Sequence, residues 1–168
     1  MKVIHFIPSI DKSIGGPARS STQLVLFLAK LSPSDTFELH TLRCSDPIRK
    51  DFELTNAKII FNEKWTSINL NNVDLLHVHG IWSLSIHWLL TKARSNSIPY
   101  VISIRGMLEP WSLNQKRLKK KLALWLYQYK DLQNANALHV TSDEECNSVR
   151  RLDLRNSIIN IPNGIDES

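Results

Sequence analysis

The sequence predicts an α/β fold in which a parallel sheet carries helices on both faces. Short runs rich in β-branched and aromatic residues alternate along the chain with longer runs of helical periodicity. The short runs are apolar at successive positions, so both of their faces need a cover, as in parallel sheets. The length of 168 residues is enough for one domain with a sizeable core.

Seven segments are strand candidates because they are short and rich in strand-favouring residues. The strongest are Lys2–Ile7, Phe37–Leu42, Leu75–His79, Tyr100–Ile104 and Ala137–Val140. The weaker ones are Lys58–Phe61 and Ile158–Ile161.

Four helices are expected between these strands, at Pro17–Leu31, Trp82–Arg94, Pro110–Leu132 and Ser142–Leu152. The first has proline in its first turn and an apolar stripe of Leu24, Phe27, Leu28 and Leu31. The third is expected to bend or break near its lysine run. The fourth begins with Ser142 as N-cap and Glu145 three residues later, which is a capping-box pattern.

The composition restricts the class of protein and its partners. A net charge of +5 favours anionic partners such as nucleotide phosphates, anionic lipids or nucleic acids. The apolar runs are too short to span a membrane, and the two cysteines form no metal or redox motif. We therefore expect a cytoplasmic protein, and a peripheral position at the inner membrane face is left open.

Ligands bind beyond the carboxyl ends of strands in open α/β sheets. This rule selects four loops, Pro8–Gly16, Gly80–Ser83, Arg105–Trp111 and Thr141–Glu145. In the first loop, Gly15 and Gly16 precede a helix whose free N–H groups can face an anion, and the alternative is a flexible turn.

Arg105 can bind a phosphate or a carboxylate through its planar fork, and Gly106 permits a tight backbone beside it. The structural alternative is an ion pair with Glu109, and the two roles are compatible.

His77 and His79 share one face of a predicted strand. A zinc site would need a third ligand, and none is evident, so no metal or other cofactor is expected. His79 is the better candidate to face a ligand, whereas His77 is expected to be buried and hydrogen-bonded. Trp82 is compatible with helix packing and with substrate stacking.

The segment Lys116–Lys121 holds five of the 21 basic residues and has aromatic neighbours. It is compatible with an interfacial membrane helix, with a nucleic-acid contact or with a solvated lysine face. We favour the last interpretation, because a core stripe with helical spacing is available. That stripe consists of Leu118, Leu122, Trp125, Leu126 and Tyr129. Nucleic acid is not an expected partner, because no RNA or DNA motif accompanies the charge.

Five pieces in a fixed order resemble the retaining glycosyltransferases of family four, which have the GT-B fold. They are Gly15-Gly16-Pro17, the run 77–82 (HVHGIW), the run 105–111 (RGMLEPW) with Lys116, the run 141–145 (TSDEE) and the run 161–166 (IPNGID). The resemblance covers the whole chain and implies the N-terminal, acceptor-side half of a two-domain enzyme. It implies a Rossmann-like domain at residues 1–162 and the start of an interdomain linker at 163–168. The C-terminal donor-binding domain of the family, with its Glu-x7-Glu pattern, has no counterpart in this sequence.

The resemblance also implies roles for individual residues. The catalytic residues are His79 and Arg105, and the donor-phosphate contacts are Gly15, Gly16, Arg105 and Gly106. The acceptor contacts are Trp82, Met107, Glu109, Trp111 and Lys116, and the structural caps are Ser142 and Glu145. Many family members have histidine where this chain has Arg105, so charge stabilisation of phosphate is the role expected here.

The reaction implied is transfer of a sugar, with retention, from a nucleotide-diphosphate donor to the hydroxyl of a glycan or lipid-linked acceptor. The setting implied is bacterial polysaccharide or glycan synthesis, and the nucleotide sugar is a substrate rather than a cofactor. The isolated domain is expected to be inactive. The alternative is a stand-alone binding subunit of a split transferase, which recruits a donor-binding partner or a membrane-linked acceptor.

Overall fold

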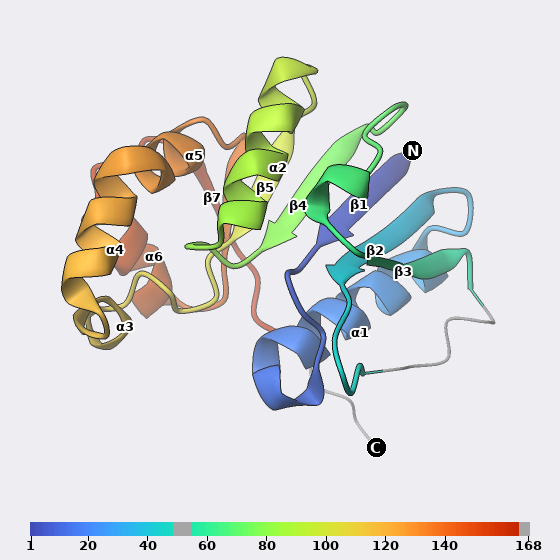
Figure 1. Cartoon of the computed structure of the whole chain (residues 1–168), viewed down its shortest axis with the longest axis horizontal. Coiled ribbons are helices and arrows are strands. Elements are labelled where there is room, and N and C mark those ends of the chain that lie inside the picture. The colour runs from blue at the N-terminus through green and yellow to red at the C-terminus, as the bar shows by residue number, and fades with distance from the viewer. Residues whose placement is uncertain (49–54, 165–168) are drawn as a thin grey trace.

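Seven parallel strands form one sheet in the order β3-β2-β1-β4-β5-β6-β7 (Figure 1). The computed structural model describes residues 1–48 and 55–164, so residues 165–168 of the predicted linker lie outside the described part. The strands are β1 (Lys2–Phe6), β2 (Thr36–Leu42), β3 (Ala57–Asn62), β4 (Leu75–His79), β5 (Tyr100–Ser103), β6 (Ala137–Val140) and β7 (Ser157–Asn160). Both the strand predictions and the parallel α/β fold are confirmed.

Helices connect β1 to β2 and each pair of successive strands from β4 to β7, as predicted. They are α1 (Gly16–Leu31), α2 (Leu84–Ser95), α3 (Pro110–Asn114), α4 (Arg117–Ala123), α5 (Tyr129–Gln133) and α6 (Asp143–Arg150). Short turns of other helix types are η1 (Lys12–Ile14), η3 (Trp65–Ser67) and the π-helical η4 (Leu124–Gln128). None of the helices in the described ranges is long and apolar enough to cross a membrane.

The strand order reverses at β1, and this reversal decides which face each helix covers. The chain runs outward from β1 to β3, then returns to β4 and runs the other way to β7. Because crossovers between parallel strands are right-handed, α1 lies on one face and the helices after β4 lie on the other. Figure 1 shows α1 beside β1–β3 and the later helices grouped around β4–β7.

Two apolar clusters follow from this arrangement, one on each face. On the α1 face, Val3, Phe37 and Leu39 pack against Val25 and Ala29 of the helix. The larger cluster on the opposite face joins β1, β4, β5 and β6 to α2, α5 and α6. It includes Ile4, Phe6, Leu76, Val78, Leu89, Leu90, Ile102, Leu132, Leu138 and Val149.

The apolar stripe predicted for α1 is not the side that packs on the sheet. The buried side consists of the smaller residues Ala18, Ser21, Thr22, Val25 and Ala29. Small side chains let the helix backbone approach the strands closely, which a row of leucines would prevent. The predicted stripe Leu24, Phe27, Leu28 and Leu31 is partly or fully exposed instead.

The third predicted helix is broken, as expected, at Lys116, whose φ of 54° is left-handed. The core stripe predicted for it is wrong, because four of its five members are exposed. The exposed fractions are 82% for Leu118, 57% for Leu122, 81% for Trp125 and 59% for Leu126. The inward side of this segment is occupied by polar contacts instead, described below.

A buried polar network fastens α2 and α5 to β5. Asp131, fully buried, accepts hydrogen bonds from His87 Nδ1 and from Arg94 Nη1, both at 2.8 Å. The Tyr100 hydroxyl donates to the Asp131 backbone oxygen at 2.9 Å and accepts from Arg94 at 3.1 Å. Asp131 therefore joins α2 through its carboxylate and β5 through its backbone oxygen.

Replacement of Asp131 by alanine is expected to lower the free energy of unfolding by about 3 kcal/mol, because it leaves the largely buried Arg94 charge without its anionic partner. Urea denaturation of the variant and the wild type measures the difference. Asp46→Ala removes an exposed ion pair with Lys12 and is the matched control, with little expected change. Equal losses in both variants would show that the buried pair is not stabilising.

Candidate functional site

Arg105 lies where the carboxyl end of the sheet meets the start of α1. It follows β5 with a φ of 59°, and Gly106 after it has a φ of 70°. Two successive left-handed residues make a sharp turn, for which glycine is suited and arginine is not. Left-handed residues other than glycine are strained and occur often at functional sites. The turn directs the Arg105 side chain toward α1.

Three elements hold the Arg105 guanidinium. Its Nη1 donates to Ser20 Oγ of α1 at 2.9 Å and to Asn163 Oδ1 of the C-terminal segment at 2.6 Å. Its Nη2 lies 3.1 Å from His79 Nδ1 at the end of β4. Burial lowers the pKa of Arg105 from its usual value, although a guanidinium remains charged at neutral pH. The predicted ion pair with Glu109 does not form, since the Glu109 carboxylate accepts from the Trp111 indole at 2.7 Å.

The contact with Arg105 determines which ring nitrogen carries the proton in two neutral histidines. A guanidinium can only donate, so His79 Nδ1 accepts and a neutral His79 carries its proton on Nε2. His79 Nε2 lies 3.1 Å from His5 Nδ1, which therefore accepts in turn. The proton of His5 is then on Nε2, which is buried and has no hydrogen-bond partner among the described residues.

A second chain of hydrogen bonds crosses the same face of the sheet. His77 Nε2 and His139 Nδ1 both lie 2.7 Å from the hydroxyl oxygen of Ser103. His139 Nε2 lies 3.0 Å from the carbonyl oxygen of Ile161, to which it donates. The chain links β4, β5 and β6 to the segment that leaves the sheet.

Burial is the main reason that these imidazoles stay neutral. Burial, together with a smaller effect of the positive charge of Arg105, lowers the pKa of His5 to about 3. Burial also holds the pKa values of His77 and His79 well below 6.5, and it lowers that of His139.

The structure supplies the third histidine that was not evident in the sequence. One ring nitrogen from each of His5, His77 and His79 lies within 4.8 Å of the others, a spacing that could hold a metal ion. The fixed positive charge of Arg105 beside His79 opposes a second cation there. Since two of the rings are also hydrogen-bonded to each other, we interpret the cluster as a support for Arg105.

The burial of the two histidines of β4 differs from the expectation, although His77 is hydrogen-bonded as expected. His79, expected to face a ligand, is only 2% exposed, whereas His77, expected to be buried, is half-buried and lines a cavity. The left-handed Gly80 ends the strand directly after His79, and its amide bonds to Ser103 of β5, so the ring stays under the sheet edge.

Glu145 joins two of the four loops that the sheet topology selects. Its carboxylate accepts from the Gly106 amide, and from the Thr141 amide at 2.6 Å. The Ser142 hydroxyl caps α6 by accepting from the Glu145 amide at 3.2 Å. In a capping box the Glu145 carboxylate would accept from the Ser142 amide, whereas here it accepts from the amide of the preceding residue, Thr141. The same carboxylate supports the turn at Arg105 through the Gly106 amide.

A polar pocket of about 370 Å³ lies between the first turns of α1 and Arg105. Gly16, Arg19 and Ser20 line one side, and Arg105, Thr141 and Asn163 line the other. The structure therefore brings together Gly16 and Arg105 of the predicted donor-phosphate set. Gly15 (exposed, with a φ of 74°) starts the helix beside this pocket, and Gly106 lies behind Arg105.

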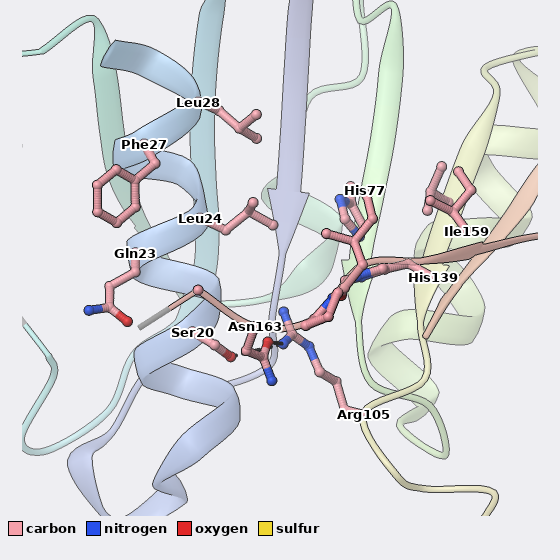
Figure 2. A pocket seen from close by; sticks show the side chains of 14 residues that line it. Ser20, Gln23, Leu24, Phe27, Leu28, His77, Arg105, His139, Ile159 and Asn163 are labelled. Carbon is pink, nitrogen blue, oxygen red and sulfur yellow. Dashed lines mark hydrogen bonds between the residues drawn. The ribbon is translucent and has the colours of Figure 1, made fainter. Parts of the chain in front are cut away.

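A larger, mainly apolar cavity of about 530 Å³ continues from the polar pocket along α1. Figure 2 shows Leu24, Phe27 and Leu28 of α1 on one side and Ile159 on the other, with Arg105 and Asn163 meeting at one end. On this face of the sheet, α1 covers only the strands β1–β3. The cavity therefore lies over the strands β5–β7, which α1 leaves uncovered.

The predicted acceptor residues do not line either of these cavities. Trp82 packs against the loop after β5, with its indole N–H 3.4 Å from the Met107 carbonyl oxygen. The Met107 sulfur accepts from the Ile81 amide at 3.2 Å. Glu109 and the 61% exposed Trp111 bond to each other, and Lys116 is exposed at the break before α4. The acceptor role of all five stays a prediction.

Sequence reasoning missed His5, Ser20, Ser103 and His139 as members of the site. Each contributes through a neighbour on a different strand or helix, so no local motif marks it. Period-two alternation offered one signal: His5, His77, Ser103 and His139 are polar residues within strands that are otherwise apolar.

Residues 18–168 match the family described as Glycosyltransferase Family 4. The chain belongs to glycosyltransferase family 4. No curated protein matches it.

Among solved structures, this family 4 domain matches sucrose-phosphate synthase from Thermosynechococcus elongatus with a TM-score of 0.70 at 15% identity. The match covers 99% of this chain and 49% of that one, so the domain spans about half the length of the synthase. A homoserine dehydrogenase from S. aureus matches at a TM-score of 0.42 and 12% identity, over 84% of this chain and 32% of its own, which is too weak to carry an argument. The resemblance inferred from the sequence is confirmed, and the fold is that of an N-terminal GT-B domain.

The neutral buried histidines predict a stability that falls with acidity. His5 has a pKa of about 3 in the folded chain and 6.5 as its ordinary value, so the unfolded state binds more protons between these pH values. The stability that depends on neutral His5 is therefore fully present above pH 6.5 and is lost progressively as the pH falls toward 3. At pH 5 the loss of stability caused by His5 amounts to about 2 kcal/mol, from about 1.4 kcal/mol per pH unit below 6.5.

Urea denaturation at pH 7.5 and pH 5 tests this linkage. The variant His5→Gln cannot titrate, so it should lose about 2 kcal/mol less than the wild type between the two pH values. An identical loss in both proteins would mean that His5 is not held neutral.

Proposed function

We propose that this chain is the acceptor-side half of a retaining glycosyltransferase, which transfers a sugar from a nucleotide-diphosphate donor to an acceptor hydroxyl. The observation that carries the proposal is the polar pocket between Arg105 and the N-terminus of α1. Family membership supports sugar transfer as the activity, and the polar pocket supports a diphosphate as the group bound there.

Two features of the pocket suit a diphosphate. The first turn of a helix leaves backbone N–H groups without partners inside the helix and has a positive dipole end. Arg19 and Arg105 add two side-chain cations around the same space. Both glycines before Pro17 have open space around the position of a Cβ, so a ligand can approach their backbone.

In the transfer step, the bond between the sugar and the diphosphate breaks and negative charge accumulates on the departing phosphate oxygens. Donors already aimed at that position stabilise the charge without having to reorient. Arg105 is held in this way by Ser20, Asn163 and His79 before any ligand binds. His79, which is buried, acts in this proposal by positioning Arg105 rather than by touching the substrate.

The acceptor belongs to the side of the site formed by the loop 105–111. We assign acceptor contacts to Trp82, Met107, Glu109, Trp111 and Lys116, of which Trp111 and Lys116 are exposed. The acceptor is a glycan or a lipid-linked sugar in bacterial polysaccharide or glycan synthesis. The enzyme acts in the cytoplasm, in peripheral contact with the inner face of the membrane.

A second candidate is a stand-alone subunit of a split transferase, in which residues 1–162 form the complete acceptor-side domain. The apolar cavity favours it, because Phe27, Ile159 and Ile161 on its rim are 47%, 42% and 57% exposed. An exposed apolar surface of this kind is covered by a partner in many proteins. The partner would be a separate chain that binds the nucleotide sugar.

Arg105→Met is expected to weaken binding of a nucleoside diphosphate at least about tenfold, because it removes a charged donor from the phosphate pocket. Titration of the chain with UDP and with uridine, followed by amide chemical shifts, measures it. In the wild type, UDP should shift the Gly16 amide and uridine should not. Arg151→Met, beyond the end of α6, is the matched control and should bind like the wild type. Equal responses to UDP and uridine would contradict a phosphate site.

Sugar transfer should require more than this chain. The 168 residues alone are expected to show no turnover with nucleotide sugars, because they provide one wall of the site. Transfer should appear when the complete coding region, or a donor-binding chain from the same genome, is supplied, and the product should keep the anomeric configuration of the donor. Rapid transfer by the 168 residues alone would contradict the proposal.

A further inference from the structure

The segment formed by α4 and η4 is amphipathic in the reverse sense. Helices on the surface of soluble proteins turn apolar residues inward and polar ones outward. Here the outward side carries Leu118, Leu122, Trp125 and Leu126, with exposed fractions between 57% and 82%. These four residues, called the α4 stripe below, are spaced by four, three and one positions, which places them within about 100° of the helix circumference.

Polar contacts on the inward side fix this orientation. The Gln128 side chain, 1% exposed, accepts from the Trp82 amide at 2.8 Å. The Tyr127 hydroxyl donates to the Trp82 carbonyl oxygen at 3.0 Å. Lys120 turns inward as well, where its ammonium group bonds to the Ser112 hydroxyl at 3.1 Å and lies 5.6 Å from the Trp82 ring centroid. The segment cannot rotate to bury its leucines without breaking these bonds.

Positive charges flank the α4 stripe on both sides. Lys121 lies on one side of it and Lys119 on the other, with Arg117 at the start of the helix, and all three are exposed. No acidic residue occurs between Glu109 and Asp131. Figure 1 shows α3 and α4 together at one edge of the molecule, away from α1.

The chemistry of this surface matches an anionic lipid bilayer. Leucine and tryptophan bury in the boundary between headgroups and acyl chains, while the flanking lysines attract anionic headgroups. The 12 residues from Arg117 to Gln128 extend about 18 Å, which suits a helix lying in the membrane plane and is too short to cross it. A protein partner fits less well, since lysine is depleted at protein interfaces.

We propose that the α4 stripe, with Lys119, Lys121 and Arg117, is a docking surface for an anionic membrane. Docking there would hold the loop 105–111 and the exposed Trp111 close to the lipid headgroups, because α3 connects that loop to α4. The surface stands on its own geometry, and only its use for a lipid-linked acceptor rests on the proposed function.

Vesicle co-sedimentation tests the surface with the full chain. Binding is expected to vesicles of phosphatidylcholine with about 30 mol % phosphatidylglycerol at about 0.1 M salt, with much weaker binding to pure phosphatidylcholine. The double variant Leu118→Ser, Trp125→Ser should reduce partitioning at least about tenfold, because binding scales with the apolar area buried. The charge variant Lys119→Gln, Lys121→Gln should weaken binding and its dependence on salt.

Matched controls separate the surface from general hydrophobicity and charge. Leu31→Ser removes a leucine that is 79% exposed on α1, against 82% for Leu118, and should bind vesicles like the wild type. Lys58→Gln, Lys64→Gln removes two exposed lysines elsewhere and should also have no effect. Because all these positions are exposed, circular dichroism should show folded variants.

Three results would overturn the proposal: equal binding to anionic and neutral vesicles, equal loss in the α4 and control variants, or a self-association that the double variant abolishes. The last result would assign the surface to a second copy of the chain. Vesicle binding by Arg105→Met and UDP binding by the double variant should both match the wild type. The membrane surface and the phosphate site can therefore fail independently.

Discussion

The guanidinium of Arg105 is the contact on which the site depends. It is hydrogen-bonded to α1, to the end of β4 and to the segment after β7, three parts of the chain that lie far apart in the sequence. The buried histidines keep their neutral form mainly because they are removed from water, and the positive charge of Arg105 adds to this effect. The sheet order brings these parts to one edge, and the Arg105 turn joins them.

The fold was predictable because its signals are local and repeated. Each strand is a short apolar run and each helix has its own start signal, so errors in one element do not spread to the next. Gly16 and Arg105 were found for a similar reason, since the carboxyl-edge rule needs only strand positions. The motif order then pointed to the family that residues 18–168 match.

The misplaced residues share a different cause. The leucines of α1 and α4 have helical spacing, but spacing does not say which of two faces meets the sheet. In α1 the small residues around Ala18 and Val25 pack on the sheet. In the segment formed by α4 and η4, the hydrogen bonds of Tyr127 and Gln128 to Trp82 decide which side faces inward. The site histidines depend on register across strands, as in the pairing of His5 with His77, which single-strand patterns do not encode.

The bond between Arg105 and Asn163 connects the polar pocket to the C-terminal segment. Nη1 has two hydrogens, and Ser20 and Asn163 use both of them. An anion that accepts from Nη1 must therefore displace one of these partners, and Asn163 lies on the segment that leads away from the sheet after β7. Binding of an anion that displaces Asn163 is thus thermodynamically linked to the anchoring of that segment, with each weakening the other to the same degree.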